Sequence, residues 1–260
     1  MMQLIDTHAH IYSKEFAKDI HDVLRISEEQ GVNKIYMPNV DATTIDGMLE
    51  MEQKYPAMCI PMMGLHPCHV EKGFERELYV VEEWLAKRPF VAVGEIGLDY
   101  YWDKTHIAEQ KEALSIQLEW AKKYKIPVAI HCRNSFSDTA DIIEAAQDGT
   151  LRGVFHCFSG TAADAERAVN LGFMLGIGGV VTFKNGGIAE IMPDIDLANV
   201  ILETDCPYLA PVPHRGKRNE PSYIRLIAEK LADLKQMPLQ ELAAITTSNA
   251  LRLFEKSDNQ

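Results

Sequence analysis

The chain has no long hydrophobic run, and no basic segment followed by an apolar stretch near its first residues. A membrane-spanning helix needs roughly 18 or more apolar residues in succession, and a secretory signal needs the basic-then-apolar pattern. We therefore expect a cytoplasmic protein that contacts no membrane. Linkers, low-complexity segments and composition shifts are also missing, which predicts one domain over residues 1–260 and gives no sign of an obligate protein partner.

Cysteine is scarce and irregularly placed. The five cysteines are an odd number and lack the close paired spacing of a zinc ribbon or a disulfide framework. We expect them to be reduced thiols that pack as small apolar residues. They are Cys59, Cys68, Cys132, Cys157 and Cys206.

Positive charge is in deficit as well, because 26 Lys and Arg face 38 Asp and Glu, for a net charge of −12. A protein that coats DNA without sequence preference relies on many cationic side chains, so this class is disfavoured. A phosphate-handling enzyme stays compatible with the composition. Divalent cations and a local basic patch can attract a polyanion, since salt screens repulsion beyond roughly 8–10 Å.

Short apolar runs typical of buried strands recur along the chain, with amphipathic helical stretches between most of them. This alternation predicts an α/β fold with a parallel sheet covered by helices, and eight units in a chain of this length favour a single (β/α)8 TIM barrel. No glycine-rich nucleotide-binding fingerprint follows the first run, which disfavours an open sheet. Clear helices are expected over 106–124 and 161–172, the latter ending at Gly172. The apolar runs cover residues 3–8, 33–39, 59–65, 90–97, 126–132, 152–158, 172–179 and 199–205.

The sequence DTHAH at residues 6–10 places two histidines two positions apart at the end of the first predicted strand. Residues i and i+2 of a strand share a face, so both imidazoles would point into one volume. Other metal-competent side chains fall at later strand ends, which in such a barrel meet on one rim. Imidazole and carboxylate without thiolate suit zinc, manganese, iron or magnesium. The strand-end residues are His8, His10, His66, Glu95, His131, His156 and Asp205.

Six of these residues are too many ligands for one tetrahedral ion. We expect two divalent ions (Mg²⁺, Mn²⁺ or Zn²⁺) about 3.5–4 Å apart, bridged by Glu95 and sharing a water whose pKa they lower. Asp205 would accept the proton of that water during attack, so Glu95 and Asp205 are the predicted catalytic residues. The expected division is His8, His10 and Asp205 on one ion, and His131 and His156 on the other.

Several motifs together resemble the TatD family of metal-dependent deoxyribonucleases, within the amidohydrolase-like barrels. They are DTHAH, GLHP, GEIGLDYYW, HCRN, HCFSG, ETDCPYL and RGKRNEP. The resemblance covers nearly the whole chain and implies a two-metal phosphodiesterase acting on DNA, commonly as a 3′-to-5′ exonuclease on single strands. It implies the same metal ligands: His8, His10, Glu95, His131, His156 and Asp205. Related amidohydrolases bridge their metals with a carbamylated lysine where this chain has Glu95.

Substrate contacts are expected on the same rim, because a phosphodiester needs cationic or hydrogen-bonding groups around its oxygens. The candidates are His66, Arg133, Ser159, Arg215 and Arg218. Ser159 fits equally well as the N-cap of the following helix, and the basic loop over 211–221 is otherwise a solvated surface. The aromatic residues over 100–102 would either stack against bases or pack against neighbouring loops. Asp6 would either orient His8 or be a plain buried carboxylate.

Two other functions use the same features. The metal centre suits hydrolysis of an ester or amide, for example in an aminoacyl-tRNA, because activated water attacks an acyl carbon as well as a phosphoryl phosphorus. A metal-binding scaffold without turnover is the third hypothesis. Product analysis separates the first two, since one releases nucleotides and the other leaves the nucleic acid intact.

Overall fold

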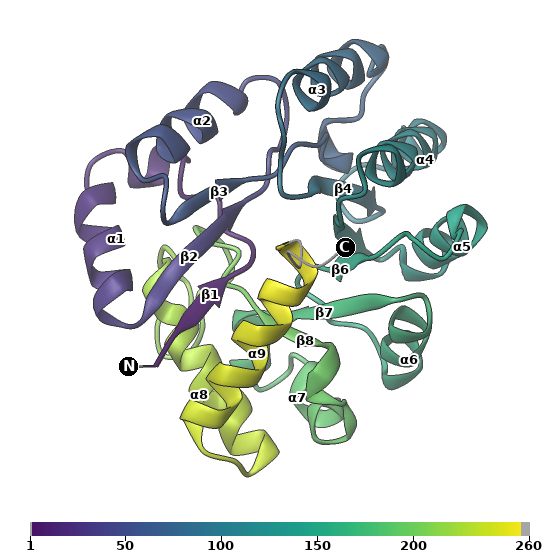
Figure 1. Cartoon of the computed structure of the whole chain (residues 1–260). Helices are drawn as coiled ribbons and strands as arrows, with labels where there is room; N and C mark the ends of the chain where they lie inside the picture. Colours follow the sequence, from purple (N-terminus) through teal and green to yellow (C-terminus); the bar gives the residue numbers. More distant parts are fainter. Residues whose placement is uncertain (1, 256–260) are drawn as a thin grey trace.

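Eight parallel strands form a barrel in the computed structural model, which describes residues 2–255 (Figure 1). Hydrogen bonds join them into two sheets, in the orders β1-β2-β3 and β4-β5-β6-β7-β8. Single parallel bridges close the two seams, Met63 with Val93 and Ala9 with Cys206. The predicted (β/α)8 barrel is thus confirmed. The strands are β1 Leu4–Asp6, β2 Val32–Met37, β3 Cys59–Pro61, β4 Val93–Asp99, β5 Val128–Arg133, β6 Gly153–Phe155, β7 Phe173–Ile177 and β8 Val200–Leu202.

Helices alternate with the strands and surround them (Figure 1). Both helices expected by residue range are present as α4 and α6, and Gly172 follows α6 in the left-handed conformation with φ 87°. The α-helices are α1 Ile20–Glu29, α2 Ile45–Lys54, α3 Glu75–Lys87, α4 Ile107–Tyr124, α5 Phe136–Ala146, α6 Ala162–Asn170, α7 Ile188–Ile191, α8 Ile224–Lys235 and α9 Leu239–Phe254. Short 3-10 helices occupy Lys14–Phe16, Pro67–His69, Gly179–Thr182, Met192–Asp194, Leu197–Asn199 and Pro221–Tyr223.

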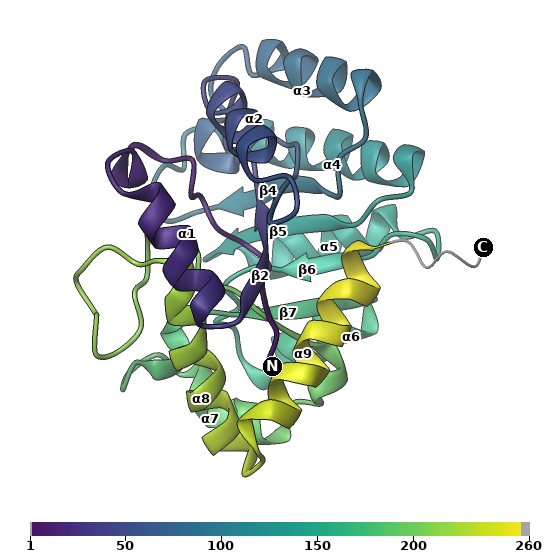
Figure 2. The same cartoon turned by 60° about the vertical axis from the view of Figure 1, so that its left-hand side comes forward.

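The two ends of the barrel differ. Helix α9 lies across the end that faces the viewer in Figure 1, where Phe254 stacks on Tyr36 with ring centroids 4.6 Å apart. The strands of the larger sheet run toward the opposite end, and the long loop after β8 extends there (Figure 2). The carboxyl ends of all eight strands therefore open on the side away from α9, where barrels of this kind carry their chemistry.

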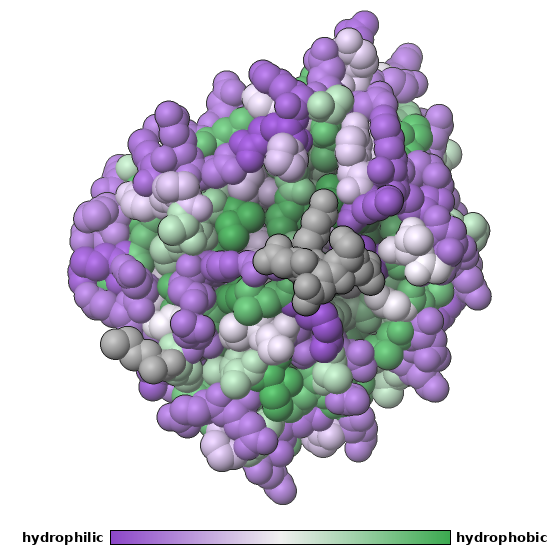
Figure 3. All heavy atoms as spheres, in the orientation of Figure 1, coloured by the Kyte–Doolittle hydropathy of each residue, from purple (hydrophilic) through white to green (hydrophobic). Residues whose placement is uncertain are grey.

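No helix within residues 2–255 is long and apolar enough to cross a membrane. Seen from the α9 end, the periphery is mostly hydrophilic, and apolar side chains show mainly between the helices (Figure 3). This distribution is that of helices with one apolar face turned to the core.

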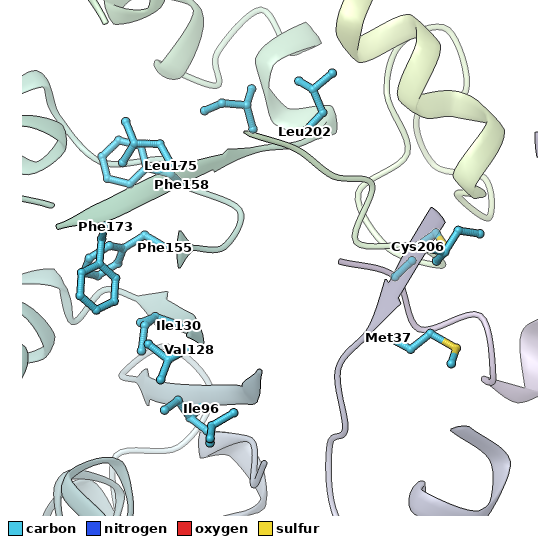
Figure 4. Packing of buried hydrophobic residues seen from close by; sticks show 14 of the residues in the cluster. Met37, Ile96, Val128, Ile130, Phe155, Phe158, Phe173, Leu175, Leu202 and Cys206 are labelled. Carbon is cyan, nitrogen blue, oxygen red and sulfur yellow. The ribbon is translucent and has the colours of Figure 1, made fainter. Parts of the chain in front are cut away.

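Apolar side chains pack in two layers. One cluster takes one residue from or beside each strand and includes Phe254, so it fills the barrel interior below the carboxyl ends. Its strand members are Ile5, Tyr36, Met62, Ala92, Ala129, Val154, Met174 and Ile201. The larger cluster lies between the strands and the helices, where Ile130, Phe155 and Phe173 follow one another on successive strands (Figure 4). The interior is thus filled, and only its open end is free for polar residues.

Helix α6 begins with a capping box at Thr161. The Asp164 N–H donates to Thr161 Oγ1 (3.2 Å), and the Thr161 N–H donates to Asp164 Oδ2 (2.8 Å). The N-cap is therefore Thr161, so the alternative role of Ser159 as the cap is wrong. Ser159 lies two residues earlier, exposed.

Replacing Thr161 by Ala should lower the free energy of unfolding by about 1 kcal/mol, because it leaves helix N–H groups unpaired. Chemical denaturation monitored by circular dichroism measures this difference. Ser159→Ala is the matched control and should leave the midpoint unchanged. An equal loss in both variants would contradict the assignment of the cap.

Candidate metal centre

Glu95, on β4, lies at the centre of a group of histidines at the open end of the barrel. Its side chain is buried, with the residue 2% exposed, and its two oxygens face different partners. Oε2 lies 3.1 Å from His8 Nε2 and 3.5 Å from His10 Nε2. Oε1 lies 2.9 Å from His131 Nδ1, 3.3 Å from His66 Nε2 and 3.6 Å from His156 Nε2. A carboxylate with each oxygen turned to a separate set of imidazoles can bridge two ions.

The two histidines of DTHAH converge, although not within a strand. Strand β1 ends at Asp6, so both follow it in the segment where Ala9 bridges to Cys206. The Asp205 N–H donates to the His8 carbonyl (2.9 Å), and the His10 N–H donates to the Cys206 carbonyl (2.8 Å). These bonds hold the ends of the first and last strands together, with the rings of His8 and His10 5.1 Å apart.

Asp205 completes this side of the site. Its Oδ1 lies 3.6 Å from His10 Nε2 and 3.9 Å from Nε2 of both His8 and His156. The Asp205 side chain is 13% exposed, against 3% for that of Glu95. It is therefore the carboxylate of the centre that opens more to solvent and substrate.

Three groups of side chains bring their ligand atoms within 4.8 Å of one another: His8, His10 and Glu95; His8, His156 and Asp205; and His66, Glu95 and His131. All six predicted ligands take part, together with His66, which was expected only as a substrate contact. The grouping differs from the expected division, which paired His156 with His131.

The reason lies in the position of the His156 ring. It stacks on His8 with centroids 3.5 Å apart, and its centroid is 6.3 Å from that of His131. Glu203 Oε1 lies 2.9 Å from His156 Nδ1, which draws the ring toward the end of β8. His66 instead lies beside His131 on the Oε1 side of Glu95. The centroids of the His66 and His131 rings are 4.5 Å apart.

Three side chains that sequence reasoning missed lie against the outer nitrogens of these imidazoles. Asp99 Oδ2 lies 2.8 Å from His131 Nε2 and Tyr12 Oη lies 2.9 Å from His10 Nδ1, both within hydrogen-bond geometry. Glu203 Oε1 lies 2.9 Å from His156 Nδ1 as a charged neighbour, without hydrogen-bond geometry among the described residues. Such partners fix the ring orientation and the tautomer of metal-binding histidines. The sequence offered a signal for two of them, because Tyr12 lies two residues after His10 and Glu203 lies two residues before Asp205.

Asp6 contacts Thr204 and the backbone of His8 rather than an imidazole. Its carboxylate accepts from the Thr204 hydroxyl (2.5 Å), the Thr204 N–H (2.9 Å) and the His8 N–H (3.3 Å). Burial raises the pKa of Asp6 to about 7 against the effect of these bonds. Asp6 thus ties the segment carrying His8 to the segment carrying Asp205.

Burial and charge act against each other in the centre. Burial favours the neutral carboxyl of Glu95, but His66, His8 and His156 outweigh it and hold the pKa of Glu95 well below its usual range. Burial lowers the pKa of His66 to about 4. For His156, burial is outweighed by Glu203, Glu95 and Asp205, which raise its pKa to about 9.

The donor set fits divalent metal ions. Carboxylate oxygens and imidazole nitrogens crowd one buried volume, and such ligands without thiolate suit borderline to hard divalent cations. The buried His8 Nδ1 has no hydrogen-bond partner in the part of the chain that the structure describes, so nothing else there anchors that ring beyond the centre. The residues present therefore fit a metal site better than a purely hydrogen-bonded cluster.

The predicted substrate residues are placed differently from one another. Arg133 is exposed and stacks on Tyr101, with the guanidinium carbon 3.7 Å from the ring centroid. Arg215 is exposed and lies over Phe183 at 4.4 Å. Arg218 instead makes a bidentate pair with Asp19, at 2.7 and 2.8 Å, and donates to the Glu15 carbonyl. These bonds join the loop after β8 to the segment between β1 and α1 and occupy the guanidinium donors of Arg218. Arg218 is therefore not among the proposed substrate contacts.

All five cysteines are free thiols. Cys59 and Cys206 are buried, and Cys132 and Cys157 are partly buried, as expected for packing residues. Cys68 is exposed, which differs from the expectation. Its N–H donates to His66 Nδ1 (3.0 Å), so the backbone at Cys68 helps to set the His66 ring.

Comparison with known proteins identifies the family. Residues 5–255 match the family model described as TatD related DNase. The chain belongs to the TatD family. It is 38% identical to an uncharacterized metal-dependent hydrolase, YabD, of Bacillus subtilis, over 96% of this chain and 98% of that protein. It is 30% identical to the 3′-5′ ssDNA/RNA exonuclease TatD of Yersinia pseudotuberculosis, over 96% and 99% of the two chains.

The fold of this TatD family member agrees with a solved relative. The crystal structure of YjjV, a TatD homologue from Escherichia coli, superposes with a TM-score of 0.92 at 31% identity and covers 98% of this chain and 99% of that one. Membership places the chain among metal-dependent hydrolases, and the cluster around Glu95 is a group of side chains that could hold a metal ion.

Proposed function

We propose that this protein is a divalent-metal-dependent deoxyribonuclease that shortens single-stranded DNA from its 3′ end with two metal ions. The observation that carries the proposal is the Glu95 carboxylate, whose two oxygens face separate sets of imidazoles at the open end of the barrel. The substrate class is supported by the family match and by the exonuclease named among the relatives.

The residues divide the work between holding ions and moving a proton. One ion would be held by His8, His10 and Glu95, with Asp205 and His156 beside it, and a second by Glu95, His131 and His66. Two bound divalent ions supply a water nucleophile at neutral pH and stabilise charge on the phosphoryl oxygens. Asp205, the more open carboxylate, is placed to take the proton of the attacking water at Oδ1.

Cationic side chains on the same rim support a phosphate substrate. Arg133 lies two residues beyond His131, and its guanidinium, stacked on Tyr101, keeps its edge free for phosphate oxygens. Arg215 and Lys217 are exposed in the loop after β8. In a chain of net charge −12, cations in the loops that follow the strands favour an anionic substrate at that end of the barrel.

The test is hydrolysis of a 5′-labelled single-stranded oligodeoxynucleotide by metal-stripped protein resupplied with Mg²⁺, Mn²⁺ or Zn²⁺. We expect stepwise shortening that requires metal, resolved on a denaturing gel, and its loss in His156→Ala. His21→Ala is the matched control, because His21 is exposed on α1, and it should retain full activity.

Other outcomes separate the alternatives. Internal cuts would contradict exonuclease action, and shortening from the 5′ end would contradict the proposed polarity, but either result would still support a nuclease. Intact DNA under every metal, with metal bound, would contradict the nuclease, and release of amino acid from an aminoacyl-tRNA would then establish the ester hydrolase. Bound metal without hydrolysis of either substrate would support the third hypothesis, a metal-binding scaffold without turnover.

A further inference from the structure

We propose that Trp102 and Arg133 form a subsite for a nucleotide next to the scissile bond, in which Trp102 stacks on the base and Arg133, itself stacked on Tyr101, binds the phosphate. This inference rests on the proposed function and specifies where a single strand would be held. The three side chains come from the loop after β4 and from the end of β5, the two strands that carry Glu95 and His131.

The aromatic rings of this loop are exposed to an unusual degree. Trp102 is 70% exposed and Tyr101 is 53% exposed. The two rings meet edge to face, with centroids 5.0 Å apart and planes at 86°. The Arg133 guanidinium covers Tyr101 at 3.7 Å and lies 5.4 Å from the Trp102 centroid. Tyr101 therefore positions the cation, and Trp102 is the ring with a face left open for stacking.

The backbone that carries these rings is fixed. Both oxygens of Asp99 are used, since Oδ1 accepts from the N–H groups of Tyr101 (2.8 Å) and Trp102 (3.0 Å) and Oδ2 faces His131 Nε2. The Tyr100 N–H donates to the Arg133 carbonyl (2.9 Å). Exposed aromatic side chains on an ordered backbone lose little entropy when a ligand binds, which favours a recognition site.

The same contacts tie the backbone of this loop to the metal centre. Asp99 accepts from the Trp102 backbone N–H with one oxygen and faces His131 Nε2 with the other, and His131 contacts Glu95. Tyr100 is anchored outward instead, since its hydroxyl donates to Asp138 (2.8 Å), which also pairs with Lys111. The proposed subsite is thus built on the loop that Asp99 links directly to a candidate metal ligand.

A nucleobase is the occupant that this chemistry fits. An open indole face beside a guanidinium matches a base attached to a phosphate, because every base has a face that stacks and every nucleotide carries an anion. Stacking of this kind does not depend on sequence, as a general exonuclease requires. The alternative that these aromatic rings only pack against neighbouring loops disagrees with their exposure among the described residues.

The experiment compares a ten-residue single-stranded thymidine oligonucleotide with an abasic oligonucleotide of the same length, which keeps the phosphates and lacks the bases. Base stacking contributes about 1–3 kcal/mol per base, so the KM of the wild type should be roughly 5- to 150-fold lower for the thymidine strand. Trp102→Ala should abolish this difference with little change in kcat, and Trp102→Phe should restore most of it. Tyr79→Ala is the matched control, because Tyr79 is 62% exposed on α3.

A second readout does not depend on hydrolysis. Titration of metal-free protein with the thymidine strand should quench tryptophan emission in the wild type and not in Trp102→Phe. Hydrolysis with an unchanged base preference in Trp102→Ala would overturn the subsite and leave the nuclease intact. Quenching that depends on Trp102 without any hydrolysis would support the subsite and overturn the nuclease. Neither hydrolysis nor quenching would overturn both.

Discussion

Glu95→Gln is expected to abolish metal-dependent hydrolysis, with a fall in kcat/KM of at least about a thousandfold. The amide keeps the shape of the side chain but removes the negative charge that five imidazoles face and one of the two oxygen ligands. Bound metal stabilises transition-state charge by several kcal/mol, and each 1.36 kcal/mol corresponds to about tenfold in rate. Loss of the bridge should therefore remove most of the rate enhancement.

Metal content decides whether the effect is the one proposed. Inductively coupled plasma mass spectrometry should find fewer bound ions in Glu95→Gln than in the wild type after equal dialysis. Glu82→Gln, on the exposed surface of α3, is the matched control and should keep both metal and activity. Circular dichroism checks that the variant is folded. Full metal content with full activity in folded Glu95→Gln would contradict the bridging role.

Asp205→Asn is expected to lower kcat by about 10²- to 10⁴-fold, the usual contribution of a positioned proton acceptor. Asn has nearly the same shape as Asp but does not accept the proton of the attacking water. Most metal should remain bound, because Glu95 and the five histidines stay in place. KM should change little, since the substrate contacts proposed for Arg133 and Trp102 lie beyond the other side of the cluster.

Steady-state kinetics on the labelled oligonucleotide and a parallel metal analysis measure this prediction. Asp233→Asn, exposed on α8, provides the control for the chemical change alone. If Asp205→Asn loses its metal together with its activity, Asp205 acts mainly as a ligand. If it keeps full kcat, another group accepts the proton and the assigned role is wrong.

Local sequence pattern determined the fold and the composition of the site. The eight apolar runs predicted the eight strands, because buried parallel strands need near-continuous apolar residues, and Gly172 marked the end of α6 through its backbone freedom. The chemistry of Glu95 and of the histidines was also readable, since predicted strand ends of a barrel meet on one rim, although β4 continues past Glu95 to Asp99. These features depend on neighbours in sequence or on a rule common to all such barrels.

Only the tertiary structure decided which of these side chains touch. His156 stacks on His8, 148 residues away in sequence, because Glu203 at the end of β8 draws its ring to that side. Arg218, predicted as a substrate contact, pairs with Asp19, 199 positions away, which the sequence pattern did not indicate. Periodicity specifies the face on which a side chain lies, whereas contacts between distant strand ends depend on how the closed barrel brings separate loops together.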